Sequence, residues 1–269
     1  MKIKSRGFRT DLFFHHFTGV VLEYEDFLVV KTPTNPTFFW GNLIYFSAPP
    51  AEGSLEKWKI LFREHFHSMN VEHMTFAWDS PEGTEGLVAP FINDGFDLEK
   101  SVVMSARNIV LPIKYNRDIV VRPIETEDEW LLIVENHVLA RGDNFQEVPF
   151  RKFASRQISN YRLMVNNKLG YWLGAFLGEQ LVGDLGIFSE HGLARFQTVV
   201  TRPDFRRRGV CSTLVYETCK FAMDKMNAEE LIMVADPEYH AAKIYESVGF
   251  TPCELQIGVC KFNKDVWAT

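Results

Sequence analysis

The stretch Val199-Val-Thr-Arg-Pro-Asp-Phe-Arg-Arg-Arg-Gly-Val-Cys-Ser-Thr-Leu214 decides the fold of this chain. An apolar strand ends at Pro203, four Arg fall within the seven residues 202–208, and a helix is expected over 212–226. Unpaired amides in the first helical turn, a close approach at Gly209 and neighbouring guanidinium groups suit a phosphate or pyrophosphate. The stretch therefore predicts an anion site at a helix N-terminus.

Two common nucleotide-binding patterns do not fit this stretch. No Gly-Lys-Ser/Thr follows the turn, so it is not a Walker loop, and the spacing Gly-x-Gly-x-x-Gly of a dinucleotide site is absent. A solvated basic turn is the alternative interpretation. The succession of strand, Pro, Arg-x-x-Gly and helix start favours the anion site.

Two motifs resemble the GNAT superfamily of N-acetyltransferases. Pro203–Cys211 is similar to that family's Gln/Arg-x-x-Gly-x-Gly/Ala signature, with Arg206 and Gly209 in register. Asp236–Phe250 is similar to its second motif, whose helix carries an Ala, a Tyr and a closing Gly-Phe. The resemblance extends over about residues 117–262.

The resemblance implies an α/β fold with a mixed, V-shaped sheet that splays between its central strands. In that family the pantetheine arm of acetyl-CoA lies in the cleft, paired with strand main chain, and helix-start amides hold the pyrophosphate. Carried over to this sequence, the implied cofactor-binding residues are Val199, Val200, Thr201, Arg206, Arg207, Arg208, Gly209, Val210, Cys211, Ser212 and Thr213.

Two positions depart from the family pattern. Cys211 replaces the final Gly or Ala of the signature, and we expect it to serve packing, since the implied chemistry forms no acyl-enzyme. Glu238 stands where the family often has Asn.

The implied reaction is direct attack of a neutral amine on the thioester carbon. An amide near Val199 or Val200 would stabilise the oxyanion. Tyr245 would protonate the departing thiolate, because a phenol with a pKa near 10 can donate to a thiolate at neutral pH. A packed helix aromatic is the alternative role for Tyr245.

The general base stays open at this stage. The strand that ends in the Arg loop has no carboxylate. Candidates acting through water are Glu190 and His191 before that strand and Asp236 after the next one, although each also fits an ordinary turn or cap. Arg195 and Gln197 on the strand itself are expected to bind substrate, which would suit an acidic or polar acceptor.

Three functions are compatible with these residues. The first is an acetyl-CoA-dependent N-acetyltransferase that acts on a primary amine of a small molecule or peptide. The missing strand carboxylate motivates the second, a catalytically inactive CoA-binding sensor or interaction module. Transfer of a longer acyl group is the third.

The length of 269 residues favours two domains. We expect a degenerate GNAT-like domain over 1–115 and a catalytic GNAT domain over 116–269. Phe91–Phe96 and Tyr245–Phe250 share the pattern aromatic-x-x-x-Gly-Phe, and each follows an apolar strand that ends at an Asp. The first half has no Arg-x-x-Gly loop, so a second cofactor is not expected there.

The N-terminal half also shows periodic elements. Its expected strands and helices are a strand at 27–30, an interrupted strand at 38–46, a helix capped by Ser54, a strand at 71–78, a helix at 85–93 and a strand at 98–105.

Composition narrows the class of partner and the compartment. A net charge of −6 argues against nucleic acid, and no apolar run reaches the roughly 20 residues of a membrane span. The four Cys form no C-x-x-C pair, and the His65, His67 and His73 grouping lacks Cys ligands, so a cytoplasmic protein without a metal is expected. The Arg- and Phe-rich chain would allow a homodimer.

Overall fold

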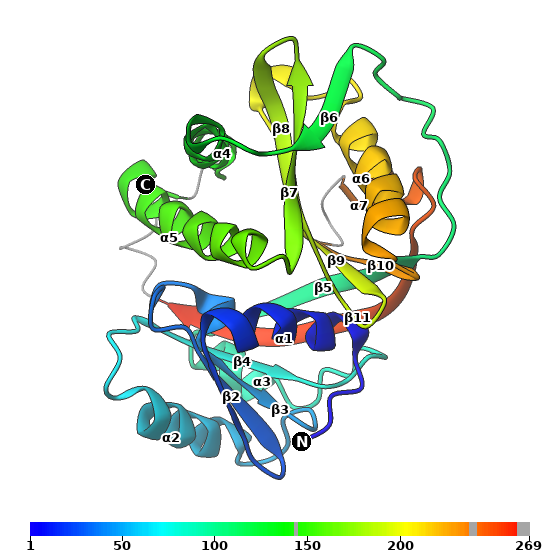
Figure 1. Cartoon of the computed structure of the whole chain (residues 1–269). Coiled ribbons are helices and arrows are strands. Elements are labelled where there is room, and N and C mark those ends of the chain that lie inside the picture. Colours follow the sequence, from blue (N-terminus) through cyan, green and yellow to red (C-terminus); the bar gives the residue numbers. More distant parts are fainter. Residues whose placement is uncertain (143–144, 237–240, 263–269) are drawn as a thin grey trace. The chain divides into compact units, whose positions relative to one another are not determined.

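The computed structural model describes residues 1–142, 145–236 and 241–262 of the chain (Figure 1). Internal contacts divide it into unit 1, Met1–Val103 with the segment that starts at Cys253, and unit 2, Met104–Pro252. Glu238 lies outside the described residues. Within the described part, no helix has the length and apolarity that a membrane span requires.

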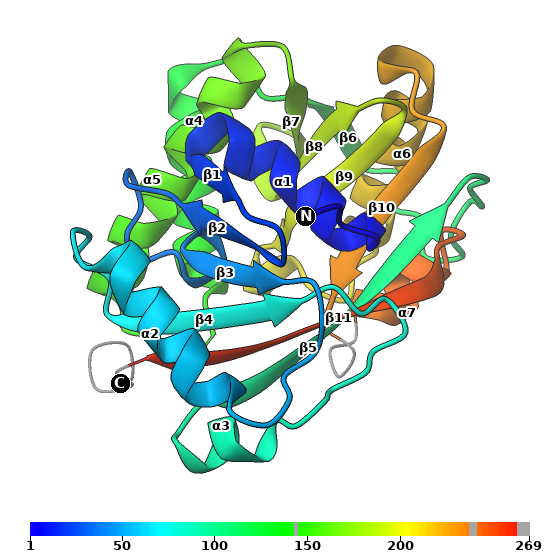
Figure 2. The ribbon, with the colours of Figure 1, turned by 90° about the horizontal axis from the view of Figure 1, so that it is seen from below.

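Unit 1 is a mixed sheet with helices on both faces (Figure 2). Its neighbouring strands run in the order β1 (Val20–Glu23), β2 (Phe27–Lys31), β3 (Leu43–Phe46), β4 (His73–Trp78), β11 (Thr251–Phe262) and β5 (Asp97–Ala106). Its helices are α1 (Arg6–Thr18), the 3₁₀ turn η1 (Phe39–Gly41), α2 (Ser54–Phe66) and α3 (Ala89–Asn93). Helix α1 packs on one face of the sheet, whereas α2 and α3 pack on the other.

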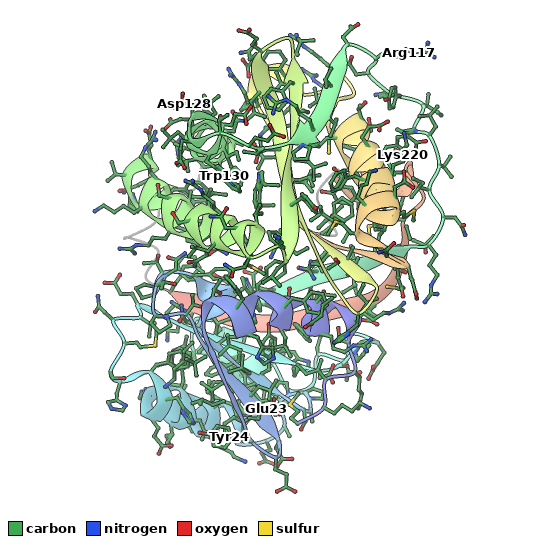
Figure 3. All side chains as sticks on the ribbon, viewed as in Figure 1. Glu23, Tyr24, Arg117, Asp128, Trp130 and Lys220 are labelled. Atoms are coloured by element: carbon green, nitrogen blue, oxygen red, sulfur yellow. The ribbon has the colours of Figure 1, made fainter. Side chains whose placement is uncertain are left out.

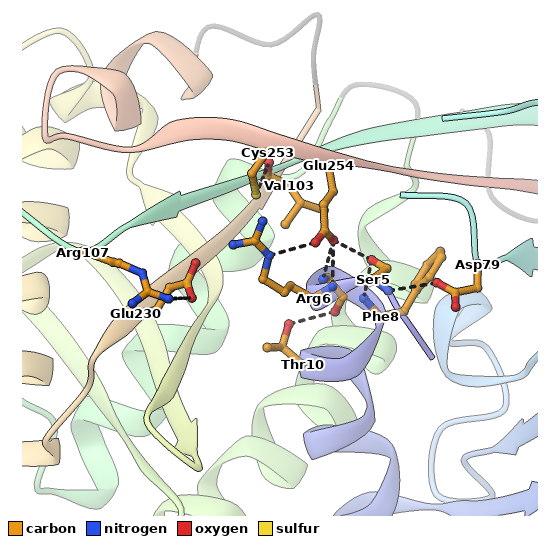
Figure 4. Close-up of polar contacts among 11 residues, drawn as sticks. Ser5, Arg6, Phe8, Thr10, Asp79, Val103, Arg107, Glu230, Cys253 and Glu254 are labelled. Atoms are coloured by element: carbon orange, nitrogen blue, oxygen red, sulfur yellow. Dashed lines mark hydrogen bonds and ion pairs between the residues drawn. The ribbon is translucent and has the colours of Figure 1, made fainter. Parts of the chain in front are cut away.

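Helix α1 was not expected from the sequence, and two carboxylates fix its start (Figure 4). The Ser5 hydroxyl accepts from the Phe8 amide and donates to Glu254, and Glu254 also accepts from the Arg6 amide at 2.7 Å. Asp79 accepts from the Ser5 amide at 3.0 Å. Acceptors at a helix N-terminus satisfy its unpaired amides, and here they come from distant parts of the sequence.

Unit 2 contains the strands in the order β10 (Glu230–Ala235), β9 (Leu193–Thr201), β8 (Gln180–Glu190), β7 (Gly170–Leu177) and β6 (Ile119–Pro123). Helices α4 (Glu127–Ala140) and α5 (Glu147–Asn166) cover one side, and α6 (Val210–Met226) with α7 (Ala241–Glu246) covers the other (Figure 1). Figure 3 marks these two sides by Asp128 and Trp130 on α4 and by Lys220 on α6. The 3₁₀ turn η2 (Pro203–Phe205) leads from β9 towards α6.

Local sequence signals explain the unit 2 elements. A capping box starts α4, because the Thr126 hydroxyl accepts from the Glu129 amide while the Glu129 carboxylate accepts from the Thr126 amide. Strands β7 and β8 form an antiparallel hairpin whose turn contains Gly178 at φ 61°.

The two halves of the chain share an order of elements. Antiparallel strands β1–β3 in the first half and β7–β9 in the second are each followed by a crossover helix, a strand parallel to the third, a short helix and a further strand, which is β5 in the first half and β11 in the second. Helices α2 and α6 both begin after a left-handed glycine, Gly53 at φ 77° and Gly209 at φ 76°. Gly95 and Gly249, the glycines of the shared Gly-Phe pattern, also have positive φ. The shared motif therefore marks equivalent positions in two related α/β units.

Three expected boundaries differ in the structure. Gly53 rather than Ser54 caps α2, and the helix expected at 85–93 is confined to Ala89–Asn93. Strand β11 pairs antiparallel with β4, from Ile257↔Trp78 to Phe262↔His73, so most of it belongs to unit 1. The division expected at 115/116 misses this return of the chain, because a single cut cannot assign a late strand to an early sheet.

Candidate functional site

Strands β9 and β10 separate and leave an open wedge in the unit 2 sheet. Their parallel pairing covers only Leu193–Arg195 of β9 with Glu230–Ile232 of β10. Beyond these pairs, β9 continues to Thr201 and is paired on its other edge with β8. The splay expected between central strands is thus present, and one edge of 196–201 is available to an extended ligand.

A β-bulge shapes β9 inside the wedge. The pairs Asp184↔Val200 and Gly186↔Gln197 leave two β9 residues opposite one β8 residue. One of the two is Thr198, whose φ of 44° is rare for a β-branched side chain. Because a bulge bends a strand and redirects its amides, it turns the main chain of Thr198 and Val199 away from regular pairing.

The loop between β9 and α6 forms a cradle of amides. Arg207 (φ 63°) and Gly209 (φ 76°) both adopt left-handed backbone conformations, and turns of this kind gather N–H groups into an anion-binding concavity. No side chain caps α6. The Thr213 amide donates to the Gly209 carbonyl, so it is not available, which corrects one of the expected cofactor contacts. The earlier amides of the first helical turn remain for a ligand.

Basic side chains outnumber acidic ones beside this cradle. Arg202 forms an ion pair with Asp204 at 2.9 Å. Arg206, Arg207 and Arg208 are exposed and form no ion pair with any residue that the structure describes. Three exposed guanidinium groups next to a helix N-terminus favour a multiply charged anion.

Two expected cofactor side chains are engaged elsewhere. The Ser212 hydroxyl donates to the Lys114 carbonyl at 2.7 Å, and the Thr213 hydroxyl accepts from the Asn116 amide at 2.7 Å. A Cβ on Gly209 would lie 2.5 Å from the same Lys114 carbonyl oxygen. The segment 114–116 therefore braces the start of α6, and any ligand contact of Ser212 comes from its main chain.

Thr201 and Cys211 complete the cradle region. The Thr201 hydroxyl is buried at the end of β9 with no hydrogen-bond partner among the described residues. Burial raises the pKa of the Cys211 thiol to about 12, which keeps it protonated and unreactive near neutral pH. This environment agrees with a packing role for Cys211.

Asp236 follows β10, and Tyr245 lies on α7. Continuing the register from Ile232↔Arg195 places Asp236 level with Val199 across the splay. Tyr245 is buried on α7, and the centroid of its ring lies 6.4 Å from that of Phe250. The centroid of the Phe250 ring lies 5.8 Å from that of Phe196 on β9. Tyr245 thus belongs to the α6/α7 side of the sheet.

Glu190 and His191 lie far from the cradle. Both are at the β8–β9 turn, at the start of β9, whereas the wedge and the Arg loop are at its end. Seven residues of strand from 193 to 200 span roughly 23 Å. This placement supports neither Glu190 nor His191 as a base that acts through a single water.

Arg195 and Gln197 point to the α4/α5 side. They pair with Phe188 and Gly186 of β8, and cross-strand partners share a face. The ring centroids of Phe188 and of Tyr161 on α5 are 5.7 Å apart, so this face of the sheet is the one that α5 covers. The two residues expected to bind substrate therefore lie opposite the face on which α6 packs, and Arg195 is buried.

Sequence reasoning missed a buried polar cluster under this face. Asp184 of β8 is fully buried and accepts hydrogen bonds from Asn136, His137 and Trp172. The adjacent pair Asn136-His137, on the otherwise apolar buried face of α4, was the available signal. No group of three His, Cys, Asp or Glu side chains that could hold a metal occurs among the described residues.

Comparison with known proteins identifies the class of this site. Residues 133–250 match the model of the acetyltransferase (GNAT) family. Unit 2 therefore carries a GNAT acetyltransferase domain, and the wedge, the bulged strand and the Arg loop all lie within the matched region. A search among curated proteins returns no match.

Solved structures share the fold over both units. A functionally unknown conserved protein from Staphylococcus epidermidis superposes with a TM-score of 0.73 at 16% identity, covering 92% of this chain and 95% of that one. A GCN5-related N-acetyltransferase from Kribbella flavida gives 0.68 at 10% identity, covering 97% and 96%. A tandem GNAT protein from the clavulanic acid biosynthesis pathway gives 0.50 at 12% identity, covering 78% and 70%. The chain has the GNAT fold, with a mixed α/β architecture that suits two tandem units.

Proposed function

We propose that the chain is an acetyl-CoA-dependent N-acetyltransferase that acetylates a primary amine of a small molecule or peptide. The observation that carries this proposal is the wedge between β9 and β10, followed in the chain by the amide cradle, where Arg206, Arg207 and Arg208 form no ion pair with any described residue. A free strand edge followed by an anion site matches an extended ligand that ends in phosphates. The GNAT match of the same residues supports this interpretation.

The described residues fit such a cofactor. Main-chain groups of 199–201 would pair with an extended amide-containing arm, and the buried Thr201 hydroxyl, which has no partner among the described residues, offers a further hydrogen bond. Free amides at the start of α6 and the Arg206–Arg208 side chains would hold the pyrophosphate. When bound, acetyl-CoA supplies an acetyl thioester.

Three tasks then fall to this chain's residues. A main-chain amide at the bulge, at Val199 or Val200, would donate to the carbonyl oxygen as it gains negative charge. Tyr245 would donate a proton to the departing sulfur from the α6/α7 side. Arg195 and Gln197 would contact the acceptor from the α4/α5 side, and Asp236 lies close enough to the wedge to contribute there.

We propose that unit 1 holds no second cofactor. The space between α2 and α3 corresponds to that between α6 and α7, and aromatic rings fill it. The ring of Trp58 on α2 stacks on the Phe46 ring with 3.9 Å between centroids, and its centroid lies 5.2 Å from that of Phe91 on α3. Pairing of β3 with β4 also continues to Phe46↔Trp78, at the end of both strands, so no wedge opens. Unit 1 would then act as a degenerate GNAT-like domain.

Two measurements test this function. Calorimetric titration should show binding of acetyl-CoA, and free-thiol release should identify an acceptor within a panel of amino acids, polyamines, aminoglycosides and peptides. The Tyr245→Phe variant should lower kcat by about 10²–10⁴-fold while leaving acetyl-CoA affinity nearly unchanged. Absence of binding at millimolar acetyl-CoA would refute the proposal, and greater turnover with a longer acyl-CoA would revise the acyl group.

One observation favours a second candidate, a CoA-binding sensor without catalysis. On the α4/α5 face, β9 carries the buried Arg195 and no carboxylate that could act as a base. Cofactor binding without thiol release from any amine, at several pH values, would support this alternative.

A further inference from the structure

The cluster around Asp184 places an ionisable histidine next to the wedge. Asp184 Oδ1 accepts from His137 Nε2 at 2.9 Å and from Trp172 Nε1 at 3.1 Å, while Oδ2 accepts from Asn136 Nδ2 at 3.1 Å. Asp184 is 0% exposed and has no ion pair with Lys or Arg in the described part of the chain. These hydrogen bonds orient the His137 ring.

These bonds fix the state of the His137 ring. The Trp172 indole and the Asn136 amide nitrogen donate to both oxygens of Asp184, and when that carboxylate is ionised the hydrogen lies on Nε2 of His137. In the neutral ring, Nδ1 therefore carries the lone pair. Nδ1 makes no hydrogen bond with any described residue, and His137 retains 8% exposure. The arrangement presents a free proton acceptor that a buried acid orients.

The cluster lies on the side of the sheet from which an acceptor would approach. Asp184 is the direct partner of Val200 on β9, and α4 contacts both β8 and β9. The face that carries Asp184 also carries Arg195 and Gln197, as the pairs Phe188↔Arg195 and Gly186↔Gln197 show. Tyr245 approaches from the opposite face, since its partner Phe250 contacts Phe196.

We propose that His137 is the general base of the acetyl transfer and that Asp184 is its positioning residue; this rests on the proposed function. Nδ1 of His137 accepts one proton, through a water, from the ammonium group of the acceptor. The amine lone pair forms the N–C bond with the acetyl carbon as the C–S bond breaks, and the sulfur takes a proton from Tyr245. The nitrogen of the new amide then gives its second proton, through water, to the Tyr245 phenolate, and the His137 imidazolium releases its proton to water.

The surroundings of the base are mostly neutral. On α5 the buried groups are Gln157, Asn160 and Tyr161, and Gln157 donates to the Tyr161 hydroxyl at 2.8 Å. Arg195 of β9 is the cation on the same face, and Arg141 lies one turn further along α4, where it donates to the Val138 carbonyl. Asp184 is thus the group that compensates the charge of a protonated His137.

The test compares His137→Gln with His191→Gln in the full-length chain. Gln at 137 can still donate to Asp184 but cannot accept the proton, whereas His191 is an exposed histidine at the distant β8–β9 turn. The expected result for His137→Gln is a kcat about 10²–10⁴-fold lower, loss of the acidic limb of the kcat/KM pH profile and acetyl-CoA affinity within about twofold of the parent. His191→Gln should keep the parent profile.

Each outcome separates this proposal from the function on which it rests. A parent chain that acetylates an amine, with His137→Gln retaining kcat and the acidic limb, overturns the base assignment alone. A parent chain that binds acetyl-CoA but acetylates no amine overturns the proposed function as well. If His137→Gln does not fold, nitrogen NMR of the histidine-labelled parent decides: the Nε2–H tautomer is expected, and the Nδ1–H tautomer would overturn the proposal.

Discussion

Gly209 and Gly53 provide a matched pair of substitutions across the two units. Both precede the crossover helix of their unit, with φ of 76° and 77°. A Cβ on Gly209 would lie 2.5 Å from the Lys114 carbonyl oxygen, whereas a Cβ on Gly53 meets nothing within 4 Å. Changing each glycine to alanine therefore applies the same backbone strain, with a steric clash only in unit 2.

The two variants should differ in stability and more strongly in binding. A left-handed alanine costs about 1–2 kcal/mol, and this is the whole expected effect of Gly53→Ala. Gly209→Ala adds about 1–3 kcal/mol, because the backbone of 114–116 or of the cradle must shift. One kcal/mol corresponds to about 2–4 °C in Tm for a unit of this size. A shifted cradle should also weaken acetyl-CoA binding by at least about tenfold, which is about 1.4 kcal/mol.

Calorimetry of both variants, with and without acetyl-CoA, measures both quantities. Gly53→Ala should bind acetyl-CoA as the parent does and keep the same ligand-induced rise in Tm. Gly209→Ala should lose most of that rise. Parent-like affinity in Gly209→Ala, or equal loss in both variants, would refute the placement of the cofactor at the start of α6.

Three further predictions concern charge and titration. A variant with alanine at positions 206, 207 and 208 should bind acetyl-CoA about 100-fold or more weakly at low salt, and its binding should depend less on salt. Titrations at two ionic strengths measure both effects. An unchanged affinity would show that these Arg do not contact the cofactor. Cys211 in the folded chain should resist alkylation up to about pH 9, because its pKa is raised to about 12, and rapid labelling that spares folding would contradict its burial. Burial lowers the pKa of His73 to about 4, so protonation of His73 favours the unfolded chain. The free energy of unfolding of unit 1 should therefore fall by up to about 3 kcal/mol as pH decreases from 6.5 towards 4, and it should not change above pH 6.5 through this group. Denaturant titrations of His73→Gln should show a flatter pH dependence over that window.

The sequence predicted the fold of unit 2 because its signals are local. The strand before Pro203, the Arg-x-x-Gly turn and the helix after it lie within one continuous stretch, and the observed α6 starts at Val210. The internal repeat was visible from one short pattern, and the structure extends it to the whole order of elements. Helix α1 and the membership of β11 were not visible, because Glu254 and β4 fix them through contacts between distant parts of the sequence.

The candidate site shows the same limit. Local reasoning proposed the Arg loop, the strand edge and Tyr245, because they lie within recognisable motifs. It could not find the bulge at Thr198, which appears only in the pairing of β9 with β8. Nor could it find His137 and Asp184, which are 47 residues apart in the sequence and meet across a helix and a strand. Glu190 was a candidate because it is near β9 in sequence, but it lies at the wrong end of the strand.

The stoichiometry of coenzyme binding tests the central claim most directly. If one wedge and one cradle serve the whole chain, calorimetric titration should give one acetyl-CoA per chain, and alanine at 206–208 should strongly weaken this binding. Two acetyl-CoA per chain, none, or one that the triple substitution leaves unaffected would contradict a single cofactor site in unit 2.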